Sequence, residues 1–260
     1  MKNPQNILIT GASSGIGRAL AMKYSQSAVN LFLSGRDNKK LEETKKLCQN
    51  LKIKNAANIS CKIIDVKNET DMRNWINGIE ENHHLDLVIA CAGISAGTQG
   101  GLESVAQVKE ILAVNIDGVL NTINPAIEKM RVRKKGQIAL ISSLAGFRGL
   151  PSSPAYSASK AAIRVYGEAL RGNLGKEGIQ VNVVCPGYIK TPMTDVNDFP
   201  MPLLMTAEKC SSLISKGLAQ NKSRISFPFP LFFTVWLSAL LSNKITDPIF
   251  AKLPGKKPLS

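Results

Sequence analysis

The sequence predicts an α/β protein, built as one doubly wound parallel sheet of about seven strands with helices on both faces. Six short apolar runs recur along the 260 residues, at 7–10, 29–34, 59–64, 85–90, 137–142 and 179–185. Segments of helical composition separate them, at 38–51, 69–81, 103–130 and 154–176. Continuously apolar strands that alternate with helices are typical of parallel sheets buried on both faces. Residues 224–227 are expected to add an edge strand, and Pro125 to kink the helix that contains it.

A glycine-rich turn follows the first apolar run. Gly11, Gly15 and Gly17 have the spacing Gly-x-x-x-Gly-x-Gly, and a helix-forming segment begins at Arg18. A strand, a glycine turn and a helix N-terminus together form a pyrophosphate site, because the glycines let the backbone approach and the helix end offers free N–H groups. The Gly-Lys-Ser/Thr sequence of a P-loop is absent from this turn. These features predict a Rossmann-type fold that binds a dinucleotide.

Tyr156 and Lys160 are one helical turn apart, so their side chains leave the same face of the helix predicted over 154–176. Ser153 is expected to cap this helix and Pro154 to occupy its first position. A positive charge beside a phenol favours the phenolate, so we expect Lys160 to lower the pKa of Tyr156 from about 10 toward neutrality. Such a phenol exchanges a proton readily with an alcohol or a ketone.

Together these features resemble the short-chain dehydrogenase/reductase superfamily. The glycine turn is similar to its cofactor motif, and Tyr156 with Lys160 to its Tyr-x-x-x-Lys pair. Ser143, thirteen residues before Tyr156, and Asn115 stand where the family carries its other catalytic residues. The resemblance runs from about residue 7 to 195, and it implies that these four residues are catalytic, with Ser143 and Tyr156 touching the substrate. It further implies that the cofactor contacts Gly11, Ser13, Ser14, Gly15, Ile16, Gly17, Arg36, Asp65, Val66, Ala92, Gly93, Tyr156, Lys160, Pro186, Gly187, Ile189 and Thr191.

The end of the second apolar run predicts NADP(H) as the cofactor. An NAD site usually has an acidic residue about twenty positions after the glycine motif, where it binds the ribose hydroxyls. Gly35 occupies this position and Arg36 follows it, so no carboxylate repels a 2′-phosphate and a guanidinium is available to bind one. Asp37 competes for the acidic role, but its place before 38–51 favours a helix cap.

The resemblance implies hydride transfer between NADP(H) and the carbonyl or alcohol of a small hydrophobic or lipid-like substrate. Tyr156 is expected to give a proton to the carbonyl oxygen during reduction, while Ser143 hydrogen-bonds that oxygen. Lys160 is expected to hold the nicotinamide ribose, and Asn115 a water that links Lys160 to solvent. Two alternatives remain: a sugar-nucleotide epimerase, whose relatives differ in glycine spacing, and a noncatalytic NADPH-binding sensor or scaffold.

One position departs from the family pattern, because Cys91 replaces an asparagine that braces the central strands. A buried structural cysteine and a redox-sensitive thiol both fit this position, and the first is favoured. The five cysteines are scattered without Cys-x-x-Cys spacing, so we expect a reducing compartment, no disulfide and no zinc site. No acidic or cysteine cluster accompanies the two histidines, at 83 and 84, and no metal site is predicted.

The formal net charge of +14 is high for such an enzyme. A nucleic-acid partner is not predicted, because no binding module or interleaving of basic and aromatic residues accompanies the charge. Solvated helix faces and attraction to anionic lipid or to a phosphorylated cofactor account for it better. The first strand follows Met1 closely, so we expect no signal peptide and a cytoplasmic protein, with peripheral membrane contact as one alternative. The resemblance implies a homodimer or homotetramer.

The chain is expected to divide into a dinucleotide-binding and catalytic core at 1–195 and, at 196–260, a substrate lid and apolar extension of the same domain. Prolines and methionines between 191 and 205 favour an irregular, mobile lid over a hydrophobic substrate. A helix predicted over 231–241 is too short to cross a bilayer and carries one polar stripe, at Thr234, Ser238 and Ser242. Two interpretations remain for 227–241: packing on protein, or lying in a membrane interface.

Overall fold

A computed structural model describes residues 1–27, 30–51 and 57–258. The strands are β1 (Asn6–Ile9), β2 (Asn30–Gly35), β3 (Asn58–Ile63), β4 (Leu87–Ala90), β5 (Gly136–Ile141), β6 (Ile179–Pro186) and β7 (Arg224–Phe227). All seven pair in parallel, in the order β3-β2-β1-β4-β5-β6-β7, so the prediction of a doubly wound parallel sheet is confirmed. Val29, predicted to begin the second strand, lies outside the described residues, as do the last two residues of the predicted extension.

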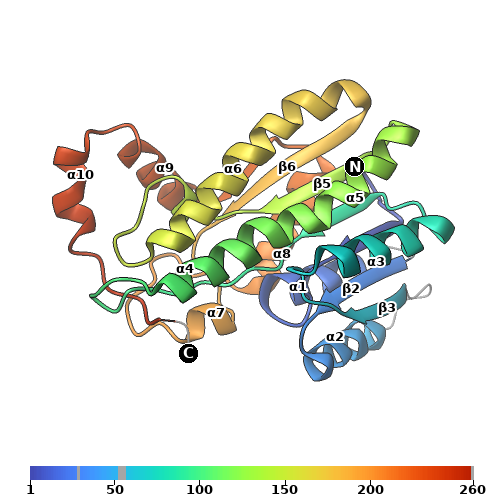
Figure 1. Cartoon of the computed structure of the whole chain (residues 1–260), viewed down its shortest axis with the longest axis horizontal. Helices are drawn as coiled ribbons and strands as arrows, with labels where there is room; N and C mark the ends of the chain where they lie inside the picture. The colour runs from blue at the N-terminus through green and yellow to red at the C-terminus, as the bar shows by residue number, and fades with distance from the viewer. Residues whose placement is uncertain (28–29, 52–56, 259–260) are drawn as a thin grey trace.

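Helices cover both faces of the sheet, and α9 and α10 lie beyond its end (Figure 1). The helices are α1 (Gly15–Tyr24), α2 (Asn38–Asn50), α3 (Glu69–Asn82), α4 (Val105–Leu112), α5 (Gly118–Arg133), α6 (Pro154–Leu174), α7 (Pro192–Asp195), α8 (Ala207–Ala219), α9 (Phe229–Ser238) and α10 (Asn243–Phe250). Short 3-10 turns span Leu144–Gly146 and Gly175–Glu177. Side chains of α1, α2 and α8 share one apolar core, and those of α3, α5 and α6 share the other.

Alternation of side chains along each strand fills both cores. Ile7 and Ile9 of β1 belong to the core under α1, α2 and α8, while Leu8 between them belongs to the core on the other face. All three are fully buried. Burial on both faces is why the strands appear in the sequence as continuous apolar runs instead of alternating ones.

The long helix predicted over 103–130 is interrupted, but not at Pro125. A π-helical turn, Ala113–Asp117, joins α4 to α5, and α5 continues through Pro125. Inside that turn the buried Asn115 accepts a hydrogen bond from the backbone N–H of Ile94 and donates one to the carbonyl of Ile94. Local π-turns of this kind frequently occur at functional sites, because they change the direction of one side chain within a helix.

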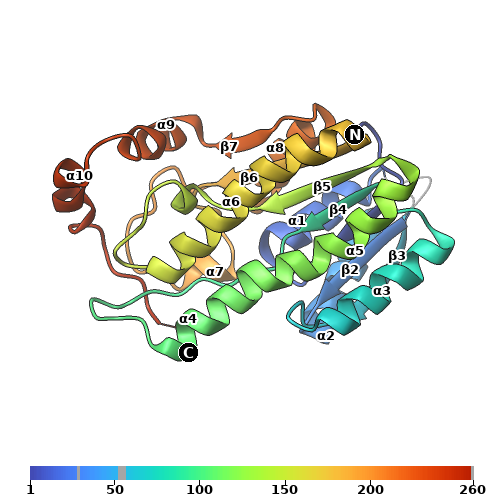
Figure 2. The ribbon, with the colours of Figure 1, turned by 45° about the horizontal axis from the view of Figure 1, so that its top comes forward.

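The segment between β6 and β7 and the segment after β7 both differ from the sequence prediction. Pro192 opens a short helix, α7, in the expected irregular lid, because proline suits the first helical position. Instead of one helix over 231–241, two helices meet at a turn over 239–242, where the Ser242 hydroxyl caps α10 by accepting from Lys244. Both α9 and α10 lie at one end of the molecule (Figures 1 and 2).

Candidate active site

A cleft of about 330 Å³ opens at the carboxyl ends of the strands, where ligands bind in open parallel sheets. Every residue predicted to contact the cofactor lines it, and so does Ser143. Asn115 does not appear on its wall. Further lining residues, which were not among the predicted cofactor contacts, are Ser34, Gly35, Asp37, Lys40, Ile64, Cys91, Ile94, Val114, Ile141, Ser142, Pro192, Met193 and Thr194.

The glycine turn is packed so closely that side chains cannot replace its hydrogens. Gly11 and Gly15 have φ values of +68° and +53°, in the left-handed region that favours glycine. A Cβ on Gly11 would lie 2.8 Å from the Cα of Ala92, and one on Gly17 would lie 2.3 Å from the carbonyl oxygen of Gly11. The turn therefore holds the N-terminus of α1 against the end of β4 and leaves its backbone free to receive a ligand.

Two buried hydroxyls in this part of the cleft have no protein partner. Among the described residues, the Oγ atoms of Ser13 and Ser34 accept and donate no hydrogen bond, although both side chains line the cleft. A buried polar atom without a partner is unfavourable, so such atoms usually indicate a missing ligand or water. The phosphate and ribose oxygens of a dinucleotide could accept hydrogen bonds from these two hydroxyls, so the site fits this class of cofactor.

The ribose end of the cleft is basic and is organised by α2. Arg36 and Lys40 both line it, and Arg36 is exposed. Asp37 acts as the predicted cap, because its carboxylate accepts from the backbone N–H of Lys40 at 3.0 Å, a hydrogen bond that lowers its pKa. The sequence signal that could have identified Lys40 was its place in the first turn after the predicted cap Asp37, at the same strand end as Arg36.

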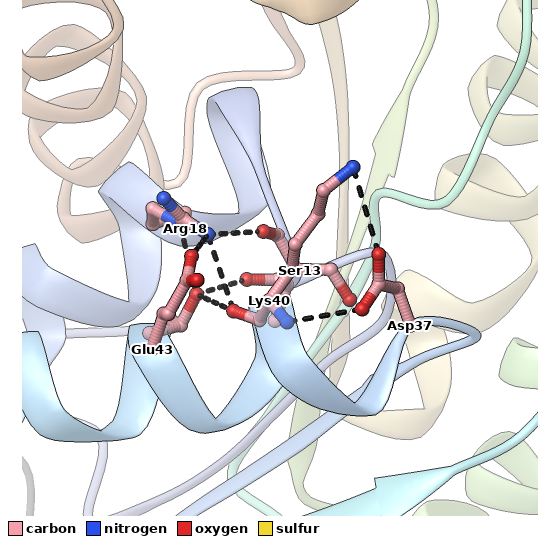
Figure 3. A network of polar contacts seen from close by, with 7 residues as sticks. Ser13, Arg18, Asp37, Lys40 and Glu43 are labelled. Carbon is pink, nitrogen blue, oxygen red and sulfur yellow. Dashed lines mark hydrogen bonds and ion pairs between the residues drawn. The ribbon is translucent and has the colours of Figure 1, made fainter.

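Arg18 fastens the glycine turn to α2 instead of adding charge to the cleft (Figure 3). Its guanidinium donates to the carbonyl oxygens of Ser13 and Lys40, at 2.6 and 3.1 Å, and lies 3.5 Å from the carboxylate of Glu43. A further bond joins it to Thr44 at 2.9 Å. This network fixes α2, and with it the position of Lys40, relative to the phosphate-binding turn.

The first two turns of α6 carry Tyr156 and Lys160 to the cleft. Pro154 occupies its first position as predicted, but the Ser153 side chain makes no cap hydrogen bond. Glu103 supplies the missing acceptor, because its carboxylate accepts a hydrogen bond from the backbone N–H of Ala155 at 2.8 Å. A negative charge at this helix end is also favourable to the helix dipole. This contact spans 52 residues of sequence, so local capping rules could not identify it.

Tyr156, Lys160 and Ser143 come together at the ends of β5 and α6. All three residues line the cleft, and the Lys160 Nζ lies 5.8 Å from the centroid of the Tyr156 ring. The same ammonium donates to the carbonyl oxygen of Ile141 at 3.0 Å. A phenol, a hydroxyl and an ammonium facing one cleft can donate a proton and two further hydrogen bonds to a bound carbonyl compound and its cofactor.

Burial controls the ionisation of this group. It raises the pKa of Tyr156 above its usual value, and the nearby Ser143 hydroxyl offsets only part of that effect. The expectation that Lys160 lowers the pKa of Tyr156 toward neutrality is therefore wrong. Burial also lowers the pKa of Lys160 to about 8. The desolvation of both groups outweighs the attraction between an ammonium and a phenolate.

Asn115 and Cys91 have structural roles in the geometry. Besides its two bonds to Ile94, Asn115 donates to the Ser159 Oγ at 3.0 Å, next to Lys160, so its amide braces the loop after β4 against α6. Cys91 packs on one apolar core, and burial raises its thiol pKa to about 12. Its backbone N–H instead donates to Thr10 at 3.1 Å, which ties β4 to β1 without the family's asparagine. A thiol so hard to ionise favours the structural interpretation over the redox one.

The C-terminal tail returns to the rim of the cleft. Gly97 and Gln99, in the loop after β4, donate backbone hydrogen bonds to the carbonyl oxygens of Lys257 and Lys256. The Lys256 ammonium donates to the Ser95 hydroxyl at 2.8 Å, and burial lowers its pKa to about 8. Lys257 lies 3.0 Å from Asp198, just beyond α7. No motif in the sequence indicated that this tail reaches the cleft, because its partners are distant along the chain.

The fold and the cleft define a dinucleotide-binding α/β protein with a Tyr–Lys–Ser group beside the cofactor site. The family model described as short chain dehydrogenase matches residues 5–199. An uncharacterized oxidoreductase of Myxococcus xanthus is 34% identical over 243 residues, which cover 92% of this chain and 94% of that protein. The chain therefore belongs to the short-chain dehydrogenase family of oxidoreductases.

Two further relatives are similar along most of the chain. A 3-oxoacyl-acyl-carrier-protein reductase of Rickettsia bellii is 33% identical over 195 residues, which cover 75% of this chain and 77% of that protein. The solved structure of a short chain dehydrogenase/reductase from Burkholderia phymatum, in complex with NAD, aligns with a TM-score of 0.83. Its identity is 22%, and the alignment covers 100% of this chain and 99% of that one, so it supports the fold.

Substitution of Gly17 by Ala should abolish most dinucleotide binding without unfolding the protein. The added Cβ would meet the Gly11 carbonyl oxygen at 2.3 Å, so the turn must open and lose its approach to the phosphates. We expect the NADPH dissociation constant, measured by calorimetry, to rise by more than about tenfold. Gly172→Ala in α6 is the control, because nothing lies within 4 Å of its Cβ position; equal binding by the two variants would contradict the role of the turn.

Substitution of Lys160 by Met should change how stability depends on pH. Between pH 8 and 10.5 the unfolded parent chain holds the lysine proton and the folded one has released it, so the parent gains stability as pH rises. The variant lacks this gain, so its stability relative to the parent should fall by about 3 kcal/mol across that window. Urea unfolding at several pH values measures it, with Lys46→Met on the exposed side of α2 as control. A difference that does not vary with pH would contradict the buried ammonium.

Proposed function

We propose that the protein is an NADP(H)-dependent reductase of small hydrophobic or lipid-like carbonyl compounds. The observation that carries this proposal is that Tyr156, Lys160 and Ser143 line the same cleft as the glycine turn. The bound cofactor supplies the hydride. The residues of this chain bind and orient the two reactants, and they provide the proton that the reduced oxygen requires.

Tyr156 serves as the proton donor to the carbonyl oxygen, and its raised pKa suits that direction. A phenol with its pKa above 10 is protonated at neutral pH, so it is ready to donate and a poor base for alcohol oxidation. Ser143 donates a hydrogen bond to the same oxygen and stabilises the negative charge that develops as hydride arrives. Lys160 holds the ribose next to the nicotinamide from its place between Tyr156 and Gly93. Asn115 acts as a positioning residue, since it fixes the loop after β4 and the Ser159 side chain.

The preference for NADP(H) over NAD(H) rests on charge at the ribose end of the cleft. Arg36 and Lys40 line this end, and Gly35 stands where an NAD-binding carboxylate is usual. Asp37 also lines the cleft, but its carboxylate is engaged by the N-terminus of α2 and lies 3.5 Å from Lys40. Arg36, Lys40 and Asp37 together carry a net positive charge, which favours a 2′-phosphate.

The substrate class is proposed from the apolar residues of the cleft. Ile94, Val114 and Met193 line it, and methionine adapts to varied apolar ligands. The Rickettsia bellii relative is described as a 3-oxoacyl-acyl-carrier-protein reductase, which acts on a carbonyl of an acyl chain. Acyl carbonyl compounds therefore belong in the first substrate panel, together with medium-chain ketones and aldehydes.

Replacement of Tyr156 by Phe should lower turnover while it preserves cofactor binding. Loss of a positioned general acid usually costs about 10² to 10⁴ in rate, and the ring that shapes the cleft remains. NADPH oxidation with the best panel substrate and NADPH calorimetry are the measurements. Tyr166→Phe, ten residues further along α6 and exposed, is the matched control. A near-normal rate in Tyr156→Phe would contradict the proposed mechanism. Tight NADPH binding by the parent without any turnover would favour the alternative of a noncatalytic sensor or scaffold.

Reversal of charge at Arg36 should shift cofactor preference. Arg36→Glu places a carboxylate beside the 2′-phosphate, so the NADPH dissociation constant should rise by about tenfold to a hundredfold while that of NADH changes much less. Titration of the parent and the variant with both nucleotides measures this. Lys46→Glu changes the net charge equally from outside the cleft and should leave the ratio unaltered. A parent that prefers NADH would contradict the proposal directly.

A further inference from the structure

Large apolar side chains are concentrated on the outer side of α9 and α10. We call the set below the α9–α10 surface; its most exposed members are Phe229 at 70%, Leu240 at 65% and Ile249 at 61%. The full set is Phe229, Phe233, Trp236, Leu237, Leu240, Leu241, Ile245, Ile249 and Leu253. Single exposed apolar residues are normal on proteins, whereas a group of this size on two consecutive helices indicates an interaction site.

The inner side of α9 is already used by the protein. Leu231 and Phe232 pack on the core, and the Phe232 ring meets Phe147 edge-on with ring centroids 5.5 Å apart. Leu231 also approaches Gly187, where a Cβ would lie 3.0 Å from it. No residue of α9 is fully buried. Packing on protein is therefore observed for the inner side of this segment, and the α9–α10 surface is left exposed.

The hydroxyls of the polar stripe expected along this segment form hydrogen bonds within the segment itself. The Thr234 hydroxyl donates to the carbonyl oxygen of Pro230 at 3.0 Å, and the Ser238 hydroxyl donates to that of Val235 at 2.7 Å. Both hydroxyls are thus satisfied within their own helix, as is usual where helices lie in apolar surroundings. Ser242 is engaged at the start of α10.

Charges around the surface are predominantly positive. No charged residue stands between Arg224 and Lys244. On α10 and just after it, Ile245, Ile249 and Leu253 recur every four residues and form one apolar stripe, while the exposed Lys244 and Lys252 each precede a member of it. Asp247 is the one acidic residue from 224 to 260, and Arg148 pairs with it at 2.5 Å. An apolar stripe bordered by lysines has the chemistry of a helix at an anionic bilayer.

We propose that the α9–α10 surface docks the protein on a bilayer that contains anionic lipid, with both helices lying in the interface. We do not propose that α9 or α10 crosses the bilayer, because no helix in the described part of the chain is long and apolar enough to span a membrane. A second copy of the chain is a less suitable occupant, since its own Lys244 and Lys252 would be brought close to those of the first copy. Anionic head groups complement these lysines while the acyl region receives the aromatic and aliphatic side chains.

Docking would place the active site close to the lipid. The Ser143 side chain caps the 3-10 turn Leu144–Gly146, which contacts α9, and the tail after α10 returns to the loop after β4. Figure 2 shows this path from α10 back toward α4 and α7. The proposal stands on the surface alone, however, and does not depend on the identity of the substrate.

Flotation of the full chain with vesicles tests the proposal. One set of vesicles is phosphatidylcholine alone, and the other is an equimolar mixture of phosphatidylcholine and phosphatidylglycerol. We expect the chain to float with the anionic vesicles, less with the neutral ones, and less at high salt. Lys244→Ala with Lys252→Ala should weaken the anionic-vesicle partition by about thirtyfold, at about 1 kcal/mol per lysine.

A second variant separates the apolar contribution from folding. Leu240→Asp with Ile249→Asp should abolish flotation, whereas Val132→Asp, at an 87% exposed position on α5, should not. NADPH binding and thermal unfolding verify that each variant is folded. If the Leu240→Asp, Ile249→Asp variant does not fold, the Lys244→Ala, Lys252→Ala variant tests the proposal alone.

Light scattering distinguishes the two occupants. A parent that stays in the aqueous fraction with both vesicle types would overturn the proposal. The proposal would also be overturned if the parent does not float and its particle mass, measured without vesicles, is larger than that of the Leu240→Asp, Ile249→Asp variant. The surface would then join two copies of the chain. Reduction of a water-soluble carbonyl substrate should be equal in parent and surface variants, so failure of the membrane proposal is distinguishable from failure of the proposed function.

Discussion

The close packing of the glycine turn on the end of β4 is the constraint on which the rest of the site depends. Gly11 lies against Ala92 and Gly17 lies over the Gly11 carbonyl, with no room for a Cβ at either contact. This packing brings the N-terminus of α1 to the point where the strand order changes direction, between β1 and β4. The cofactor cleft, the loop after β4 and the positions of Ser13 and Ser34 all follow from that approach.

Burial, more than charge pairing, sets the chemistry at the other end of the cleft. The phenol of Tyr156 is kept protonated and the ammonium of Lys160 is made easier to deprotonate, both because the surrounding protein removes water. The two groups share a helix turn, yet the direction of each pKa shift comes from desolvation. The environment of the pair, and not only its spacing in the sequence, therefore determines the protonation states of the two side chains.

The C-terminal segment connects the surface of the molecule with the site at two places. Phe232 of α9 packs against Phe147, close behind the turn that carries Ser143, and Lys256 of the tail bonds Ser95 at the opposite rim. Lys257 adds an ion pair to Asp198. Because the same segment presents an apolar, lysine-bordered face outward, a contact made there is held rigidly relative to the cleft by these inward contacts.

Local patterns were sufficient for most of the fold. Strands buried on both faces appear as apolar runs, and the predicted edge strand 224–227 coincides with β7. The glycine spacing and the Tyr–Lys pair likewise placed residues that meet in one cleft, since parallel strands carry their ends to a common edge. Each of these signals depends on residues within a few positions of one another, where backbone geometry is determined by neighbours in the chain.

Contacts between distant segments decided the remainder. Glu103 caps α6 from 52 residues away, and Lys256 reaches Ser95 across 161 residues. The π-turn at Asn115 satisfies the backbone of Ile94, which no helical period could indicate. The pKa of Tyr156 rises because elements from several parts of the chain exclude water from it. Sequence spacing specifies which side chains share a helix or a strand end, whereas desolvation, long-range capping and the exposure of α9 and α10 exist only after the chain has packed.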